Sequence, residues 1–425
     1  MSESPHPADL LPATAPRFGE ALRWWLKLGC ISFGGPAGQI ALMHDDLVEK
    51  RRWIDEARFV HAINYCMLLP GPEAQQLATY IGWRLHGVRG GVAAGVLFVL
   101  PSLLLLLALS WLYIAYHHLP AIQDVLLGLR AAVVAIIAAA AWRLAARLLE
   151  RPLQWAIALL ALLGLLWGRL PYPWLIAMAA GIGWLGLRGT AAALPTAGTA
   201  PMAVRAPAAW RAAAIVFGIC LLLWTAVYLL LPAGTLREMA LFFTRAAFLT
   251  FGGAYAVLPY VNAAAVQQYG WLAQRQMVDG LALGETTPGP LIMVVAFVGF
   301  LGGWQSHPEA PLAMALAGGL VATLYTFLPS FLLVLAGAPL IEASRGRAGL
   351  AAPLAGIQAA VIGVIAHLAL TFGRATLLPE GRLDVFALLL AAIALWGMRR
   401  RGLGVAAILL LCGLAGLLRG AWALP

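Results

Sequence analysis

Short runs of glycine and proline interrupt the apolar stretches of this chain, and each run has a partner 218 residues later (251 − 33, and 288 − 70). The pairs are Phe33-Gly34-Gly35 with Phe251-Gly252-Gly253, and Pro70-Gly71-Pro72 with Pro288-Gly289-Pro290. Such runs break helices, and the freed backbone groups are tolerated inside a membrane only where they are buried in protein or line a cavity. The N–H groups and the positive dipole end at the start of a half-helix bind anions. The doubled motif predicts an anion transport site, with a simple kink or tight helix packing as alternatives.

Two cations lie near these breaks. Lys27 and Arg245 are also 218 residues apart (245 − 27), and both lie in apolar stretches shortly before a Phe-Gly-Gly run. A cation within a span is costly and usually faces a cavity or an anion, although it can also snorkel to the lipid headgroups. We expect Lys27 and Arg245 to coordinate or steer the anion.

Two carboxylates flank the Pro-Gly-Pro runs. Glu73 follows the first run directly, and Glu285 lies just before the second. An apolar setting favours the protonated carboxyl, so both residues are candidates for carrying a coupled proton. The alternatives are a structural ion pair with Lys27 or Arg245, or a neutral hydrogen bond. The sequence does not separate these roles.

Transmembrane helices must position these residues. Of the 425 residues, 62% are hydrophobic and 11% are charged, whereas soluble domains carry about 25% charged residues. This composition predicts an all-α polytopic membrane protein. Apolar windows long enough to cross a bilayer, about 20 residues, are Gly90–Tyr116, Ala121–Leu148, Arg211–Leu231, Pro311–Ala338, Ala351–Phe372 and Val405–Leu424.

The loop charges predict an orientation. The stretch 188–210 contains arginine and proline but no acidic residue, so the positive-inside rule places it in the cytoplasm, together with the N-terminus. The crossing at 211–231 has no counterpart in the repeat, so it reverses the orientation of the second half in the membrane. The C-terminus then lies in the periplasm. Inverted-topology repeats with broken or re-entrant helices are a recurring plan of secondary transporters. The arginines at 374, 382 and 419 fall outside, against the rule.

The repeat divides the chain into five segments. Further matches, such as Pro101-Ser102 with Pro329-Ser330, have an offset of 228 (329 − 101), so an insertion lies near Gly302–Pro311. The predicted segments are a disordered leader (1–16), a first repeat (17–187), a cytoplasmic linker (188–210), an extra connecting transmembrane helix (211–231) and a second repeat (235–425). Whether 18–43 and 236–261 cross fully or re-enter is left open.

Other classes of function find less support. The net charge of +10 comes from basic residues in short loops, which does not indicate nucleic acid as a partner. The chain has no nucleotide-binding or catalytic motif and no metal-ligand spacing. We expect no enzyme activity, cofactor or metal, and a homodimer remains open. The mixed charged run His44–Arg58 indicates a solvated loop or interfacial helix, with a gate formed by Lys50, Arg51 and Arg52 as the alternative.

Several stretches resemble the two-domain chromate ion transporter family across nearly the whole chain. They are FGGPAGQI, the KRRW of Lys50–Trp53, LPGPEAQQLATYIGW, FGGAYAVLP and ETTPGPLIMVVAFVGF. The resemblance implies a bacterial inner-membrane exporter of chromate that confers chromate resistance, is driven by the proton motive force and is sensitive to the analogue sulfate. The family's FGG and PGP motifs carry over to the four runs above. The second half departs from the first, with Ala254 in place of Pro36 and Gln268-Tyr269-Gly270 in place of the KRR run.

Chromate fits the predicted site because it is a tetrahedral dianion. Paired helix N-termini with Lys27 and Arg245 would neutralise it without a metal. Sulfate has the same shape and charge, so such a site discriminates poorly between the two. A sulfate importer or a passive oxyanion channel is therefore the main alternative. A membrane enzyme would need a polar catalytic cluster at one interface.

Overall fold

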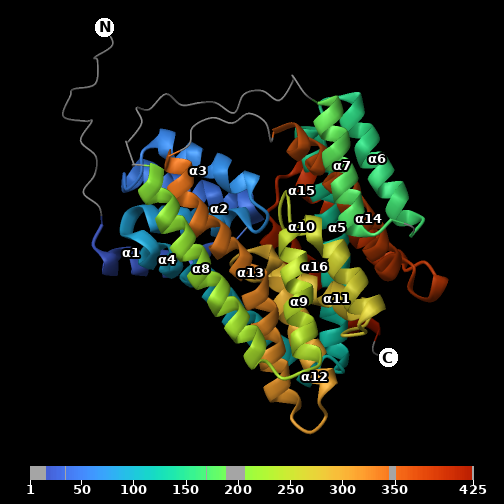
Figure 1. The fold of residues 1–425 in the computed structure, drawn as a ribbon. Helices are drawn as coiled ribbons and strands as arrows, with labels where there is room; N and C mark the ends of the chain where they lie inside the picture. The colour runs from blue at the N-terminus through green and yellow to red at the C-terminus, as the bar shows by residue number, and fades with distance from the viewer. Residues whose placement is uncertain (1–15, 34, 169, 188–205, 344–350, 424–425) are drawn as a thin grey trace.

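The computed structural model describes residues 16–33, 35–168, 170–187, 206–343 and 351–423, and the regular structure in these ranges is helical (Figure 1). The predicted leader and most of the predicted linker lie outside the described residues, as does Gly34. The predicted all-α class is therefore confirmed for the part of the chain that is described. Six of the described helices are long and apolar enough to cross a membrane, and they coincide closely with the six predicted windows.

The first repeat contains seven α-helices and one π-helix within the described ranges. They are α1 (Phe18–Ile31), α2 (Gly35–His44), η2 (Asp45–Lys50), α3 (Glu56–Leu68), α4 (Glu73–Tyr116), α5 (Pro120–Leu148), α6 (Pro152–Leu166) and α7 (Tyr172–Gly186). Asp55 caps α3 by accepting a hydrogen bond from the backbone N–H of Arg58, and proline opens α5 and α6. Non-helical dihedrals at His86 and Gly87 divide α4.

The second repeat follows the same order after the connecting helix α8 (Ala206–Leu230), which begins before the predicted start at Arg211. Its elements are α9 (Thr235–Phe248), α10 (Ala254–Asn262), η3 (Ala263–Gln268), α11 (Gln274–Thr286), η4 (Leu291–Met293), α12 (Val294–Ser306), α13 (Pro311–Ala343), α14 (Ala351–Leu377), η6 (Pro379–Gly381), α15 (Val385–Arg400) and α16 (Val405–Ala423). The π-helices η2 and η3 match at the offset of 218 (263 − 45). The break between α12 and α13 takes the place of the bend within α4.

The stretches 18–43 and 236–261 are interrupted at the Phe-Gly-Gly runs. Helix α1 ends at Ile31 and α2 begins at Gly35, while α9 ends at Phe248 and α10 begins at Ala254. A helix of 14 residues, such as α1 or α9, is about 21 Å long, which is shorter than a hydrocarbon core of about 30 Å. Each of these helices is therefore a half-helix and not a complete crossing.

The two repeats are interleaved, because helices of one pack on helices of the other. Helix α4 packs on α12 and α13, α5 packs on α14, α15 and α16, and α14 packs on α6 and α7. Glycines bring the backbones together at equivalent crossings. A Cβ atom at Gly128 would overlap the carbonyl oxygen of Cys412 on α16, and one at Gly356 would overlap that of Ala179 on α7. Such close crossings are typical of small residues in membrane bundles.

A buried ion pair also joins the repeats. Asp279 of α11 is 1% exposed and accepts hydrogen bonds from Arg130 Nε of α5 at 2.5 Å and from Arg130 Nη2 at 3.0 Å. Its Oδ2 atom also accepts a 2.9 Å bond from the hydroxyl of Tyr113 on α4. Because a buried carboxylate needs partners for its lone pairs, this contact fixes α11 against two helices of the first repeat.

Candidate functional site

Both Pro-Gly-Pro runs form loops between half-helices, as the sequence predicted. The first loop separates α3 from α4, and the second separates α11 from η4. Gly71 has a φ of +127° and Gly289 a φ of +103°, which L side chains rarely adopt. Pro72 and Pro290 cap the helices that follow, with extended backbone dihedrals. The chain is therefore folded back sharply at both loops.

Each loop is hydrogen-bonded to the other repeat. The N–H of Gly71 donates to the carbonyl oxygen of Thr250 at 2.7 Å, and the N–H of Gly289 donates to that of Ser32 at 2.8 Å. Ser32 and Thr250 directly precede the two Phe-Gly-Gly runs. The structure thus brings each Pro-Gly-Pro loop against the Phe-Gly-Gly segment of the other repeat, in two equivalent crossings.

Serines from the long helices close both crossings. A Cβ atom at Gly71 would overlap Ser330 Oγ on α13, and one at Gly289 would lie 2.7 Å from Ser102 Cβ on α4. Ser102 and Ser330 are equivalent in the repeat, and both are fully buried. Each loop therefore lies between two parts of the opposite repeat, namely the backbone before its Phe-Gly-Gly run and a serine of its long helix.

Two glutamines of the first repeat hold the two loops. Gln76 Nε2 donates to the carbonyl oxygen of Pro70 at 2.7 Å, and Gln39 Nε2 donates to that of Gly289 at 2.7 Å. The equivalent residues of the second repeat are Val257 and Val294, at the offset of 218 (257 − 39, and 294 − 76). The crossings therefore match in backbone and differ in side-chain chemistry.

Several polar atoms around the crossings have no hydrogen-bond partner among the described residues. These buried atoms are Gln39 Oε1, Gln75 Oε1, Gln76 Oε1 and Ser102 Oγ. Buried polar atoms without partners are rare in proteins and often mark a functional site. Sequence reasoning missed these side chains as site residues, although the three glutamines lie within the quoted FGGPAGQI and LPGPEAQQ stretches.

The Phe-Gly-Gly residues lie at the turns that start the second half-helices. Gly35 opens α2, and Gly253 caps α10 with Gly252 before it. Phe33 is 46% exposed, whereas Phe251 is half-buried. The N–H groups of Gly71 and Gly289 donate to the carbonyl oxygens of the residues that precede these runs, and not to the phenylalanines.

The carboxylates beside the loops face arginines of α5. Glu73 interacts electrostatically with Arg147, and Glu285 interacts with Arg143. The hydroxyl of Tyr255 also donates a hydrogen bond to Glu285. Arg143 and Arg147 are one helical turn apart, so one face of α5 supplies both cations. The structure therefore does not support the alternative in which Lys27 or Arg245 pairs with these carboxylates.

Lys27 and Arg245 lie away from the hydrogen-bond network of the loops. Both side chains are exposed, and within the described part of the chain neither makes a hydrogen bond or an ion pair. Arg245 interacts electrostatically with Tyr260 of α10. Both cations are thus exposed, on half-helices that end shortly before the Phe-Gly-Gly turns.

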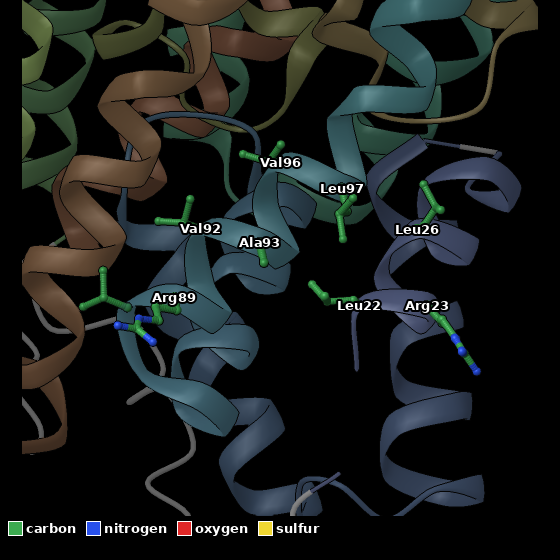
Figure 2. Close-up of a pocket in the computed structure, with 9 residues that line it drawn as sticks. Leu22, Arg23, Leu26, Arg89, Val92, Ala93, Val96 and Leu97 are labelled. Carbon is green, nitrogen blue, oxygen red and sulfur yellow. The ribbon is translucent and has the colours of Figure 1, made fainter. Parts of the chain in front are cut away.

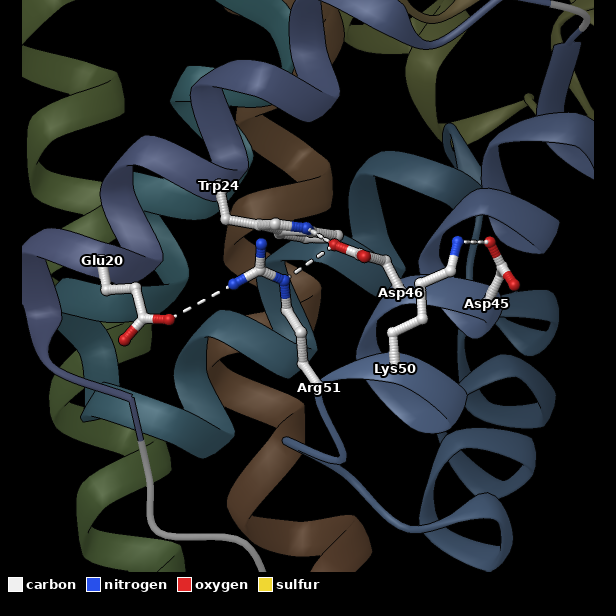
Figure 3. A network of polar contacts seen from close by, with 6 residues as sticks. All are labelled: Glu20, Trp24, Asp45, Asp46, Lys50 and Arg51. Carbon is white, nitrogen blue, oxygen red and sulfur yellow. Dashed lines mark hydrogen bonds and ion pairs between the residues drawn. The ribbon is translucent and has the colours of Figure 1, made fainter.

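The charged run at 44–58 is a structural network (Figure 3). Arg51 binds Asp46 at 2.9 Å and Glu20 of α1 at 3.2 Å, and Trp24 donates a hydrogen bond to Asp46. Partial burial acts to raise the pKa of Asp46, but the bonds from Arg51 and Trp24 outweigh it and hold this pKa below its ordinary value. Arg51 is therefore engaged in joining η2 to α1, which disfavours its role in a gate.

Comparisons with known proteins identify a family and several relatives of the chain. A family described as chromate transporter matches residues 19–184 and 237–417. The chain is 34% identical over 406 residues to a chromate transport protein of Pseudomonas aeruginosa, covering 92% of this chain and 90% of the relative. It is 31% identical to a chromate transport protein of Cupriavidus metallidurans (85% and 86% covered) and 30% identical to a probable chromate transport protein of Synechococcus elongatus (86% and 88%). No solved structure matches the chain.

Proposed function

Because the chain belongs to the chromate transporter family, we propose that its two crossed Pro-Gly-Pro loops form the site through which chromate moves. Family membership and the six long apolar helices make it a multi-pass membrane protein, and the family supports chromate transport across a membrane. The finer proposal is an antiporter of the bacterial inner membrane that exports chromate, is driven by the proton motive force, confers chromate resistance and also recognises sulfate.

The reciprocal crossing of the loops carries this proposal. Gly71 to Thr250 and Gly289 to Ser32 are equivalent bonds with the two repeats exchanged, as expected of halves related by a two-fold axis. In inverted-repeat transporters, the substrate binds where such broken helices meet. The arrangement thus supports an inverted repeat with the anion site between the two Pro-Gly-Pro loops.

The two half-helix starts differ in their attraction for an anion. Glu73 occupies the first turn of α4, where its own carboxylate offsets the positive end of the helix dipole. The helix start at Leu291 has no acidic residue in its first turn. We therefore assign the chromate oxygens to this second start. Lys27 and Arg245 then steer the anion toward the site.

Glu285 is the favoured carrier of the coupled proton. It is partly buried, bonded to Tyr255 and in electrostatic interaction with Arg143. In an antiporter the proton and the anion occupy the protein alternately. Glu285 would therefore take up its proton from the periplasmic side after chromate has left, and would release it on the cytoplasmic side before the next chromate binds. This exchange links proton movement to chromate movement without a cofactor.

Flux in proteoliposomes tests the function. Chromate and sulfate movement is measured with and without an imposed pH gradient. We expect the gradient to accelerate chromate flux and to drive accumulation. Downhill flux that ignores the gradient would indicate a passive channel, and gradient-driven uptake of sulfate with little chromate flux would indicate a sulfate importer.

A further inference from the structure

The half-helices α11 and α12 form a hairpin with the second Pro-Gly-Pro loop at its tip. A Cβ atom at Gly280 of α11 would overlap the ring of Phe297 on α12. Further from the tip, a Cβ atom at Gly302 of α12 would lie 2.9 Å from Trp271, which precedes α11. The two arms therefore run side by side from the tip toward one surface of the protein.

The ion pair of Arg130 and Asp279 lies between the tip of this hairpin and that surface. Ser102 of α4 marks the level of the tip, because it lies beside Gly289. Tyr113, which binds Asp279, is 11 residues further along α4 (113 − 102), or about 16 Å of helix. Helix α4 ends soon afterwards. The pair is therefore close to the loop between α4 and α5, which the predicted orientation places in the periplasm.

This ion pair is shielded from solvent and fastens the hairpin to the first repeat. The side chains of Arg130 and Asp279 are 13% and 1% exposed. Two bonds from Arg130, at 2.5 and 3.0 Å, and one from the Tyr113 hydroxyl, at 2.9 Å, tie α11 to α5 and α4. The Tyr113 ring also packs on Phe297 of α12, with ring centroids 5.3 Å apart. Both arms of the hairpin are thus held on this side of the tip.

The equivalent position on the other side of the crossed loops has no such contact. Asp279 corresponds to His61 of α3 (279 − 218), and Arg130 corresponds to Gln358 of α14 (130 + 228). His61 is exposed, and within the described residues its side chain makes no ion pair or hydrogen bond. The two repeats are therefore joined by buried charges on the Asp279 side and not at the equivalent position of the His61 side.

Helix packing is also looser toward the opposite end of α4. There a groove with a volume of about 720 Å³ lies between α4 and α1, and its lining is mainly apolar (Figure 2). Arg23 of α1 and Arg89 of α4 point away from each other (Figure 2). No ion pair crosses this groove among the residues that the structure describes. Movement of α1 against α4 at this end therefore separates no charges.

We propose that Arg130, Asp279 and Tyr113 form a gate that closes the periplasmic side of the anion site. In the conformation described, this gate is shut and the site is approached from the cytoplasmic side, past His61. Alternating access moves one repeat against the other around the site, so α11 must separate from α5 and α4 before the site can face the periplasm. The inference rests on the proposed transport function, because it assigns these residues to one step of that cycle.

Thiol labelling from the two sides of the membrane tests the gate. The four native cysteines of the full-length chain are changed to alanine, and one reporter is added at a time. Gly284→Cys reports on the periplasmic side, because it lies between Asp279 and the tip and its Cβ atom would meet only Val294, at 3.6 Å. His61→Cys reports on the cytoplasmic side. A membrane-impermeant maleimide is applied to right-side-out and to inverted vesicles.

The gate variant is Arg130→Gln/Asp279→Asn, which removes both charges and keeps polar side chains of similar size. We expect periplasmic labelling at position 284 to rise about 10-fold, because the shut state loses its ion pair. Cytoplasmic labelling at position 61 should not rise, whereas a merely structural role would loosen the bundle and raise both. The control Arg419→Gln/Asp384→Asn makes the same change at an ion pair of 3.5 Å elsewhere and should label as wild type.

Unchanged labelling at position 284, a rise at both reporters, or an equal rise in the control would overturn the gate. Tyr113→Phe removes one bond to Asp279 and leaves the ion pair, so it serves if the neutral pair does not fold, and should give a smaller rise on the same side. Thermal unfolding checks each variant. Labelling needs no chromate, so a lack of chromate flux in wild-type proteoliposomes would remove the transport proposal without altering the labelling result.

Discussion

At the scale of single residues, the two loop glycines are the least replaceable positions of the site. Gly71 and Gly289 combine a positive φ with close contact to a serine of the other repeat. A Cβ atom at either position would be strained by the backbone and would also overlap the serine. The crossings therefore depend on glycine for two independent reasons.

Gly71→Ala should lower the free energy of unfolding by about 2–5 kcal/mol, because dihedral strain and overpacking add. Adding Ser330→Ala removes the Oγ atom that the new Cβ would overlap and should recover part of the loss. Gly402→Ala is the control, since Gly402 has a φ of +65° but nothing within 4 Å of its Cβ position. Denaturant unfolding in detergent measures all three.

If the control loses as much stability as Gly71→Ala, the contact with Ser330 contributes nothing. Complete recovery in the double variant would instead show that the backbone strain is negligible. Intermediate recovery is the expected outcome.

The two steering cations lead to a prediction about flux. Lys27→Ala and Arg245→Ala should each reduce chromate flux at least about 10-fold, because a cation beside the path of a dianion lowers its energy there and about 1.4 kcal/mol corresponds to a factor of ten. Arg382→Ala, which removes an exposed cation in the loop after η6, is the matched control. Normal flux in both site variants, with the control also normal, would remove the steering role.

The proposed proton carrier leads to a prediction about pH. Glu285→Gln keeps the shape of the side chain but cannot ionise, so chromate flux should lose its dependence on pH. Glu309→Gln, in the exposed turn between α12 and α13, should keep the wild-type pH profile. An unchanged profile in Glu285→Gln would assign the coupled proton to another group.

The sequence predicted the loops but not their partners. Glycine and proline identify a break through their own covalent structure, so Pro70-Gly71-Pro72 was assigned correctly from the chain alone. Gln39 and Ser102 are ordinary helix residues in the sequence, and they become site residues only because Gly289 is folded against them. Lys27 and Arg245 are predicted as site residues because of their position in apolar stretches and their recurrence in the repeat, and their roles stay predictions.

At the scale of elements, the half-helices are anchored by short networks at their ends. The π-helix η2 is joined to α1 through Asp46, Arg51 and Glu20. In the second repeat, Phe242 of α9 packs instead on Tyr269 and Trp271, with ring centroids 5.8 and 5.6 Å away. The first repeat also has an aromatic contact here, between Trp24 and Trp53, but among the described residues only there do ion pairs add to it.

The network at η2 predicts a pH dependence of stability. The pKa of Asp46 is lowered in the folded state, so its contribution is present above the unfolded-state pKa and is lost as the pH falls through the folded-state value. Asp46→Asn should therefore lower the melting temperature at pH 7, and the difference from wild type should shrink in strong acid. A constant difference from about pH 7 to about pH 3 would show that the charge of Asp46 is not involved.

Asp55→Asn is a useful comparison for that experiment. Asparagine is an equally good N-cap, so this change keeps the cap of α3 while removing a nearby exposed carboxylate. It should alter the melting temperature less than Asp46→Asn.

The sequence predicts the order of the long helices more accurately than the positions of the breaks within them. The six long apolar helices agree with the predicted windows, because a run of about 20 apolar residues rarely forms anything other than a transmembrane helix. The bend at His86 and Gly87 lies just before the predicted window Gly90–Tyr116, whereas its equivalent in the second repeat is an open turn with an insertion. The inverted orientation and the cytoplasmic place of the linker remain predictions.

At the scale of the whole molecule, the repeats form one interleaved bundle. Arg130 of the first repeat and Asp279 of the second are joined inside it. The internal repeat does not predict this ion pair, because the residues equivalent to Asp279 and Arg130 are His61 and Gln358 (279 − 218, and 130 + 228). Only the packing of α5 on α11 brings the two charges together.

Arg130→Met should cost about 3–5 kcal/mol of unfolding free energy, because it leaves the Asp279 carboxylate buried without its cation. The double variant Arg130→Met/Asp279→Leu should recover most of this loss. A double-mutant cycle in detergent measures the coupling. The control is the longer pair of Arg419 and Asp384, 3.5 Å apart, in which Arg419 is exposed, and Arg419→Met should cost less than about 1 kcal/mol.

A double variant that is no more stable than Arg130→Met would show that the buried carboxylate is satisfied without Arg130. Tyr113, which also binds Asp279, would then be its principal partner.

The reciprocal bonds between each Pro-Gly-Pro loop and the Phe-Gly-Gly segment of the other repeat have a consequence for how the chain can change over generations. A Cβ atom at Gly71 would overlap Ser330 as well as the nearby Gln76, so part of any compensating change must arise far away in the same gene. Neither repeat can therefore change at these contacts independently of the other. Away from the shared backbone bonds, the side chains have diverged, as Gln39 and Val257 show. Because both repeats belong to one continuous chain, they are synthesised in equal numbers. Each Pro-Gly-Pro loop therefore finds its partner segment within the same molecule.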